Sequence, residues 1–218
     1  MSLWIKICGN TSLADAQLAA EAGADAVGFV LASSPRRVTV EQAAQMAPQL
    51  PAALEKIGVF VDAGFEEIAA AVKTAGLTGV QLHFDAPPEL AAQLRRQFGA
   101  GLRILGVVHF DAAAGERAAA IVGDENIDAL LVDSRTAGAV GGTGQAYDWN
   151  LASRTLFRSS EKRKPIVAAG GLGPENVAEA IVALRPWGVD VVSGVEAAPG
   201  IKDAAKVRAF IANARATD

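Results

Sequence analysis

The chain alternates a short apolar run with an amphipathic, Ala-rich stretch eight times, and this rhythm constrains its fold more than any other feature. Runs of this kind separated by single helices are typical of parallel strands covered on both faces. The predicted strands are residues 3–8, 25–31, 56–61, 79–83, 103–109, 128–134, 165–170 and 189–193. The predicted helices lie near residues 13–22, 40–50, 65–75, 88–98, 113–122, 149–157, 175–184 and 203–214.

Eight strand–helix units in 218 residues predict a compact (β/α)8 TIM barrel, a single α/β domain over residues 1–218. A doubly wound open sheet is the alternative, but it would leave edge strands and usually has fewer units. Residues that commonly begin helices support several of the boundaries: Thr39, Asp148, Pro174 and Asp203.

Composition narrows the class of protein. The chain is 51% hydrophobic and 20% charged, with a net charge of -4 spread along its length, which argues against disorder and against nucleic-acid binding. Cys8 is the one cysteine, so no intramolecular disulfide can form. The first residues lack the pattern of a signal peptide, and the apolar runs are too short to span a membrane. We therefore expect a cytoplasmic protein that binds neither nucleic acid nor membrane.

Unusual polar residues gather at the predicted carboxyl ends of strands, where barrel enzymes carry their reactive groups. Cys8 ends the first strand, and Lys6 shares its face because side chains alternate along a strand. A nearby ammonium favours the thiolate, which would make Cys8 a base. The alternative is that Cys8 is only a small buried apolar residue.

Asp133 ends the sixth strand on the face of Leu131. A carboxylate buried inside a barrel costs free energy unless it is paired or has a catalytic function. Burial can also keep it protonated, so that it can act as a general acid. It could instead cap a helix or pair with Lys6. An acid and a base across a barrel mouth suit aldose–ketose isomerisation, which needs no metal or redox cofactor.

Two glycine turns, Gly170-Gly171 and Ser193-Gly194, follow the seventh and eighth strands, the usual phosphate-binding position in such barrels. The Gly-rich segment 141–145, inside the long loop 135–147, is either a flap over this site or a plain connector. Arg36 follows the second strand and could grip a substrate carboxylate, although surface arginines are common. His83 and His109 suggest rim hydrogen bonding more than metal ligation, because no third ligand has suitable spacing.

The sequence resembles the phosphoribosylanthranilate isomerase family along nearly its whole length. Seven motifs occur in the family's order and at the expected strand ends: Lys6-Ile7-Cys8-Gly9, Ser34-Pro35-Arg36, Val80-Gln81-Leu82-His83, Leu131-Val132-Asp133, Gly141-Gly142-Thr143-Gly144-Gln145 with Asp148-Trp149, Ala169-Gly170-Gly171-Leu172 with Pro174-Glu175-Asn176-Val177, and Gly188-Val189-Asp190 through Ser193-Gly194-Val195-Glu196 to Pro199-Gly200-Ile201-Lys202-Asp203.

This resemblance implies an Amadori rearrangement of N-(5-phosphoribosyl)anthranilate without a cofactor. It implies that Cys8 is the general base at the sugar C2 and Asp133 the general acid at the ring oxygen. Arg36 would hold the anthranilate carboxylate, and Gly170, Gly171, Ser193 and Gly194 the phosphate. Gln81, His83 and Asp190 would complete the substrate site. The partner is then a small phosphorylated molecule, and the chain acts as a monomer or a homodimer.

The sequence departs from the family pattern at three positions: Val192 replaces the first of two serines, Phe84 a glycine and Arg37 an aromatic residue. None is the implied acid or base, so these departures bear on ligand affinity. A bifunctional isomerase of the tryptophan and histidine pathways is the nearest enzymatic alternative, but it would carry an aspartate in place of Cys8. A non-catalytic phosphate-binding scaffold is the alternative from another class, and it would not need both acid and base.

Overall fold

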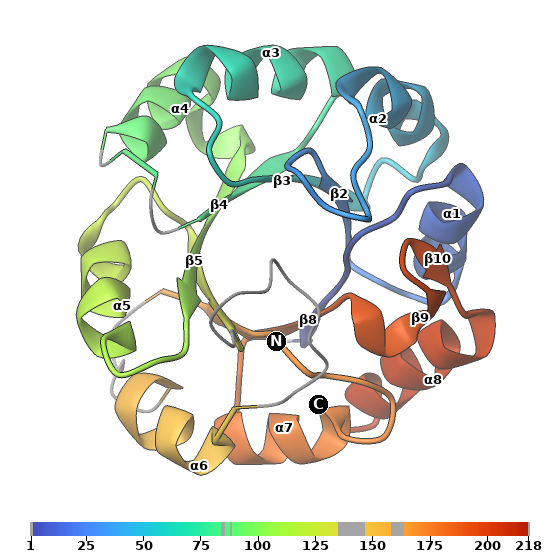
Figure 1. The fold of residues 1–218 in the computed structure, drawn as a ribbon, viewed down its shortest axis with the longest axis vertical. Helices are drawn as coiled ribbons and strands as arrows, with labels where there is room; N and C mark the ends of the chain where they lie inside the picture. The colour runs from blue at the N-terminus through green and yellow to red at the C-terminus, as the bar shows by residue number, and fades with distance from the viewer. Residues whose placement is uncertain (1, 84–85, 88, 135–146, 158–163, 218) are drawn as a thin grey trace.

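The structure is a computed structural model, and it describes residues 2–83, 86–87, 89–134, 147–157 and 164–217. Eight parallel strands close into a barrel in chain order, which confirms the predicted fold (Figure 1). The strands are β1 (Trp4–Ile7), β2 (Ala26–Val30), β3 (Glu55–Phe60), β4 (Gly79–His83), β5 (Arg103–His109), β6 (Ala129–Asp133), β7 (Ile166–Ala168) and β8 (Gly188–Val191).

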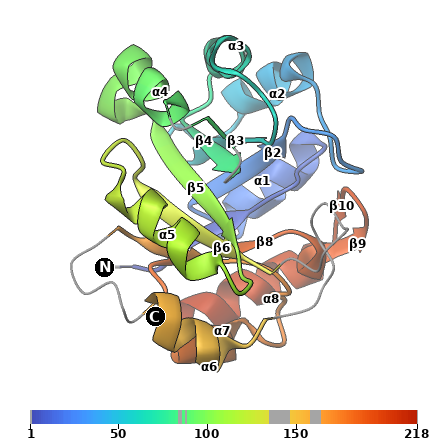
Figure 2. The same ribbon diagram turned by 60° about the vertical axis from the view of Figure 1, so that its left-hand side comes forward.

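The helices form a layer outside the strands (Figures 1 and 2). They are α1 (Leu13–Glu21), α2 (Val40–Met46), α3 (Phe65–Ala75), α4 (Leu90–Phe98), α5 (Ala114–Gly123), α6 (Trp149–Ala152), α7 (Val177–Leu184) and α8 (Ala204–Arg215). Short 3-10 turns follow α2 (η1, Ala47–Gln49), α4 (η2, Gly99–Gly101) and β8 (η4, Ser193–Val195). No helix in the described part of the chain is long and apolar enough to cross a membrane.

Side-chain caps explain where several helices begin. Thr39 caps α2 in a reciprocal pair with Gln42, and the carboxylates of Asp148 and Asp203 accept backbone N–H groups at the starts of α6 and α8. These three predicted starts are confirmed. The start predicted at Pro174 is early, because Asn176 is the residue that precedes α7.

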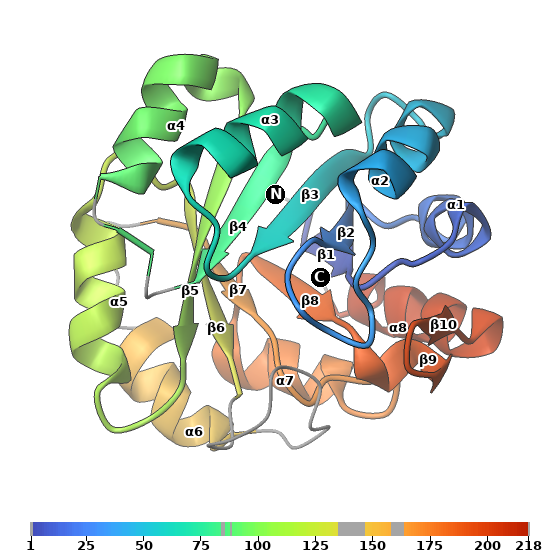
Figure 3. The ribbon, with the colours of Figure 1, turned by 45° about the horizontal axis from the view of Figure 1, so that its top comes forward.

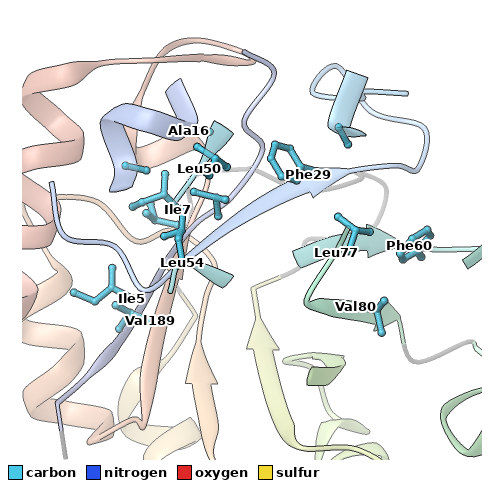
Figure 4. Packing of buried hydrophobic residues seen from close by; sticks show 14 of the residues in the cluster. Ile5, Ile7, Ala16, Phe29, Leu50, Leu54, Phe60, Leu77, Val80 and Val189 are labelled. Atoms are coloured by element: carbon cyan, nitrogen blue, oxygen red, sulfur yellow. The ribbon is translucent and has the colours of Figure 1, made fainter. Parts of the chain in front are cut away.

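Strand parity decides which side chains enter the barrel. Ile5 and Ile7 face outward and pack with Ala16 of α1 and Val189 of β8 (Figure 4). Lys6 therefore points inward, where it is fully buried. A second apolar cluster, which contains Trp4, Ile57, Leu105, Leu131 and Val167, fills the barrel interior. Polar side chains gather at the carboxyl ends of the strands.

Two features differ from the sequence-based expectation. The helix expected over residues 149–157 is α-helical only to Ala152 and continues as a π-turn (η3, Ser153–Phe157). After β8 the chain forms η4 and then an antiparallel hairpin of β9 (Glu196–Ala198) and β10 (Ile201–Lys202), which has no counterpart in the predicted elements. The two strands, Glu-Ala-Ala and Ile-Lys, form no apolar or alternating run that would predict them from the sequence.

Candidate active site

One cleft opens at the carboxyl ends of the barrel strands, the end seen in Figure 3. Every site residue predicted from the sequence except Gly194 lines it: Cys8, Arg36, Gln81, His83, Asp133, Gly170, Gly171, Asp190 and Ser193. These residues come from six strands or the loops that follow them. The closed barrel thus brings together groups that are up to 185 positions apart in the sequence, from Cys8 to Ser193.

Lys6 makes a buried polar cluster below the cleft. Its ammonium donates to Asp190 Oδ1 at 2.9 Å on the neighbouring strand β8 and to Gln81 Oε1 at 2.9 Å on β4. Burial acts to lower the pKa of Lys6, but the carboxylate of Asp190 and the nearby Cys8 outweigh it, so the pKa is raised. Lys6 is therefore a fixed positive charge beneath the cleft, and its ion pair is formed with Asp190.

Cys8 lies just past the end of β1, almost fully buried but on the cleft wall. Burial raises the pKa of its thiol, and Lys6, which lowers it, offsets this only in part because Asp190 raises it again. The net shift of the Cys8 pKa is therefore upward, opposite to the shift predicted from the sequence. The ammonium acts in the predicted direction, but burial and Asp190 outweigh it.

Asp133 ends β6 and pairs in register with His109 of β5. Its side chain is only partly buried and lines the cleft, as does that of the following Ser134. Tyr147 contacts Phe110 with ring centroids 5.0 Å apart and ring planes tilted by 34°. Burial and then the charge of Asp133 raise the pKa of its phenol. Tyr147 did not stand out in the sequence, since nothing local links it to the end of β6.

The two histidines of the chain meet at the same rim. The rings of His83 and His109 have centroids 5.4 Å apart and are tilted by 45°. Among the described residues no group of three or more His, Cys, Asp or Glu side chains is placed to hold a metal ion. The pair lies on the cleft wall beside Asp133, within reach of a ligand bound there.

The glycines after β7 and β8 allow two loops to approach each other and Asp133. Gly170 has φ +79°, and a Cβ atom there would lie 2.6 Å from Asp133 Oδ1 and overlap the backbone nitrogen of Ser134. A Cβ atom on Gly194 would overlap the carbonyl oxygen of Leu172. Only glycine permits both contacts. Ser193 begins η4, so a short helical turn starts beside these loops, as in the phosphate sites of many barrels.

Arg36 is held by a residue that we did not single out from the sequence. Its guanidinium donates from Nε to Glu196 Oε1 at 2.8 Å and from Nη2 to Oε2 at 2.7 Å. Glu196 belongs to β9 and also accepts from Lys202 of β10 at 3.3 Å. The motif around Glu196 and Lys202 was visible in the sequence, but nothing in it indicated which loop they would contact.

Comparison with known proteins identifies the family. The family model described as N-(5'phosphoribosyl)anthranilate (PRA) isomerase matches residues 5–213. The chain belongs to the phosphoribosylanthranilate isomerase family. A curated member from Roseiflexus castenholzii is 44% identical over 97% of this chain and 98% of its own length. Another from Pelobacter propionicus is 42% identical over 98% and 96%. The chain is accordingly an isomerase.

Solved structures agree with this membership. The phosphoribosylanthranilate isomerase of Thermotoga maritima superposes with a TM-score of 0.87 at 36% identity, covering 98% of this chain and 99% of that one. A family structure bound to reduced 1-(o-carboxyphenylamino)-1-deoxyribulose 5-phosphate gives 0.83 at 34% identity, with 98% and 99% covered. A 3-hexulose-6-phosphate synthase from Salmonella typhimurium, at 18% identity and 0.70, shares the fold alone.

Two predictions fall on residues outside the described part of the chain. The Gly-rich segment 141–145 is one of them, so its two interpretations, flap or connector, both stand. The departure at Phe84 is the other. Val192, by contrast, is described and lines the cleft beside Ser193. The apolar replacement therefore does lie at the site.

Proposed function

We propose that this chain catalyses the Amadori rearrangement of N-(5-phosphoribosyl)anthranilate to 1-(2-carboxyphenylamino)-1-deoxy-ribulose 5-phosphate in tryptophan biosynthesis, in the cytoplasm and by acid–base catalysis without a cofactor. The observation that carries the proposal is the placement of one acid, Asp133, and one thiol, Cys8, on the wall of a single cleft that also contains the glycine turns. A non-catalytic scaffold has no need of that combination.

Asp133 supplies the first proton. Protonation of the ring oxygen lets the bond between this oxygen and C1 break, and the nitrogen lone pair forms an iminium at C1. Cys8, as thiolate, then removes the proton from C2; the C–H electrons form a C1=C2 double bond, and the π electrons of the C1=N bond return to the nitrogen as its lone pair. Tautomerisation of the resulting enaminol gives the 2-ketone. Proton transfer by placed side chains commonly contributes about 10²–10⁴-fold to a rate.

Binding of the two anionic ends follows from the remaining residues. Arginine has five N–H donors, and Glu196 uses two of them on Arg36, which leaves three for the anthranilate carboxylate. Backbone N–H groups near Gly170, Gly171, Ser193 and Gly194 suit the phosphate. Gln81, His83 and Asp190 line the space between these ends. Gln81 and Asp190 are both fixed by Lys6, so the floor of the site is held rigid.

The test is a fluorescence assay that follows the consumption of phosphoribosylanthranilate made in situ. We expect turnover by the wild-type chain and a loss of several orders of magnitude in Cys8→Ser, because a serine hydroxyl is a far weaker base. Circular dichroism controls for the fold. Alkylation of Cys8, the one thiol of the chain, should also inactivate, and bound product should protect. Near-normal turnover by Cys8→Ser would remove Cys8 from the mechanism.

A further inference from the structure

The hairpin after β8 contacts the candidate base through one buried lysine. The side chain of Lys202 is fully buried, and its ammonium donates to the carbonyl oxygen of Cys8 at 2.6 Å. It also donates to the carbonyl oxygen of Val192 at 3.3 Å and to Glu196 Oε1 at 3.3 Å. One cation thus joins the loop after β1, the loop after β8 and the hairpin. These contacts are absent from the mechanism described above.

Glu196 extends the same network to Arg36. Its carboxylate accepts three bonds from two N–H groups of the guanidinium, one from Lys202 and one from the backbone N–H of Gly200. The side chains of Glu196 and Lys202 are 4% and 0% exposed. A buried carboxylate with this many donors has a single arrangement, because any other would leave buried charge unpaired. The positions of Arg36 and of the Cys8 backbone are therefore coupled through two side chains.

We propose that Lys202, held by Glu196, is a positioning residue for Cys8: its hydrogen bond fixes the Cys8 backbone, and its charge stabilises the thiolate. The role in turnover rests on the proposed function, whereas the effect on the thiol does not. In Figures 1 and 3 the hairpin lies on the rim of the barrel, beside α1 and α8. It is close enough to the end of β1 for direct contact and lies to one side of the barrel mouth.

Several other charged groups surround Cys8 and must be kept constant in a test. Lys6 on β1 and Lys202 on β10 lower the pKa of the thiol, against the larger effect of burial, while Asp190 on β8 raises it. Arg36 lies on the same side of the cleft, and its pKa is raised by its hydrogen bond with Glu196 and, to a smaller extent, by Cys8. Gln81, His83, His109 and Asp133 face the same cleft from β4, β5 and β6. Lys202 differs from Lys6 in that it belongs to an element outside the barrel, so it can be changed without opening the barrel interior.

The chain offers a matched control. Lys206, four residues further on in α8, also donates to the hairpin, from its ammonium to the carbonyl oxygen of Glu196 at 2.9 Å. It is exposed and does not line the cleft. Lys206→Met therefore removes a lysine that anchors the same hairpin and leaves the contact with Cys8 in place.

The experiment titrates the thiolate of Cys8 by its absorbance near 240 nm, with Cys8→Ser as the blank. We expect a higher pKa of Cys8 in Lys202→Met and in Lys202→Gln, which keeps an N–H donor for the Cys8 carbonyl, and no change in Lys206→Met. The acid limb of kcat/KM should move to higher pH by the same amount, with a loss at neutral pH of up to about 100-fold. If Lys202→Met does not fold, Lys202→Gln alone tests the proposal.

Two outcomes of the titration would overturn the role of Lys202. An unchanged thiol pKa in folded Lys202→Met or Lys202→Gln would overturn the positioning role, whatever the activity. An equal shift in Lys206→Met would do the same, because it would trace the effect to the hairpin as a whole. The titration needs no substrate. If the wild-type chain failed to convert phosphoribosylanthranilate, the proposed function would fall and the titration would still decide the role of Lys202.

Discussion

Asp133 is the residue at which catalysis can be separated from ligand binding. Asp133→Asn keeps the shape of the side chain and removes only the transferable proton. We expect similar affinity for a product analogue, measured by calorimetry, and a fall of about 10²–10⁴-fold in kcat and kcat/KM together, as for a group that acts in the transition state. A variant that loses affinity but keeps its rate would instead make Asp133 a substrate-positioning residue.

The raised pKa of Cys8 predicts how kcat/KM depends on pH. In the proposed mechanism the base is the thiolate of Cys8, whose fraction grows as pH rises through the pKa. Burial and Asp190 hold this pKa above the ordinary thiol range, so kcat/KM should still be rising with pH where a free thiol would already be ionised. The measurement is a pH profile of kcat/KM with an inert buffer series. A profile that is flat from neutral pH upward would exclude Cys8 as the titrating base.

Single residues also show where inference from sequence ends. Cys8, Asp133, Arg36 and the glycine turns could be located because strand ends are visible in the sequence and barrel topology brings them to one rim. The direction in which the pKa of Cys8 is shifted could not be predicted from the sequence. It depends on how completely the closed barrel buries the thiol and on Asp190, which lies 182 positions away and contacts Lys6 only through the pairing of β1 with β8.

Among the elements, the loops after β7 and β8 are in direct contact. Gly194→Ala would force a methyl group against the carbonyl oxygen of Leu172, so the loops must separate by more than side-chain rotation allows. We expect a higher KM for the phosphorylated substrate and weaker binding of inorganic phosphate, with a smaller effect on kcat. Gly115→Ala in α5, where a Cβ atom meets nothing within 4 Å, is the matched control. Unchanged phosphate affinity in Gly194→Ala would place the phosphate elsewhere.

The elements that carry an apolar pattern or a capping residue were predictable from the sequence. The eight barrel strands and most helix starts follow from apolar periodicity and capping residues. The hairpin β9–β10 does not, because its short strands, Glu196–Ala198 and Ile201–Lys202, are partly exposed and form no apolar run. Its role depends on ion pairs such as Arg36–Glu196, whose members are 160 positions apart. Such contacts depend on the closed barrel and are not encoded in the local sequence.

At the scale of the whole molecule, the barrel has one end for chemistry and another for stability. Trp4 of β1 stacks on Trp187, just before β8, with ring centroids 5.3 Å apart, and the guanidinium of Arg103 lies 5.5 Å from the Trp187 ring. Arg103 is itself paired with Glu55 at 2.7 Å. This cluster lies at the amino ends of β1, β3, β5 and β8, away from the cleft.

Because the aromatic cluster lies away from the cleft, we expect a change in it to affect stability and not activity. Trp187→Ala removes an aromatic stack and a cation–π contact, so we expect the free energy of unfolding to fall by at least about 1–2 kcal/mol. Because the strands between the two ends stay paired, KM and kcat should keep their wild-type values at temperatures below the transition. Thermal denaturation and the isomerase assay on the same preparation measure both quantities. Cys8→Ser should show the reverse: turnover lost and the melting temperature nearly retained. A loss of turnover in folded Trp187→Ala would mean that the packing at the closed end also sets the geometry of the cleft.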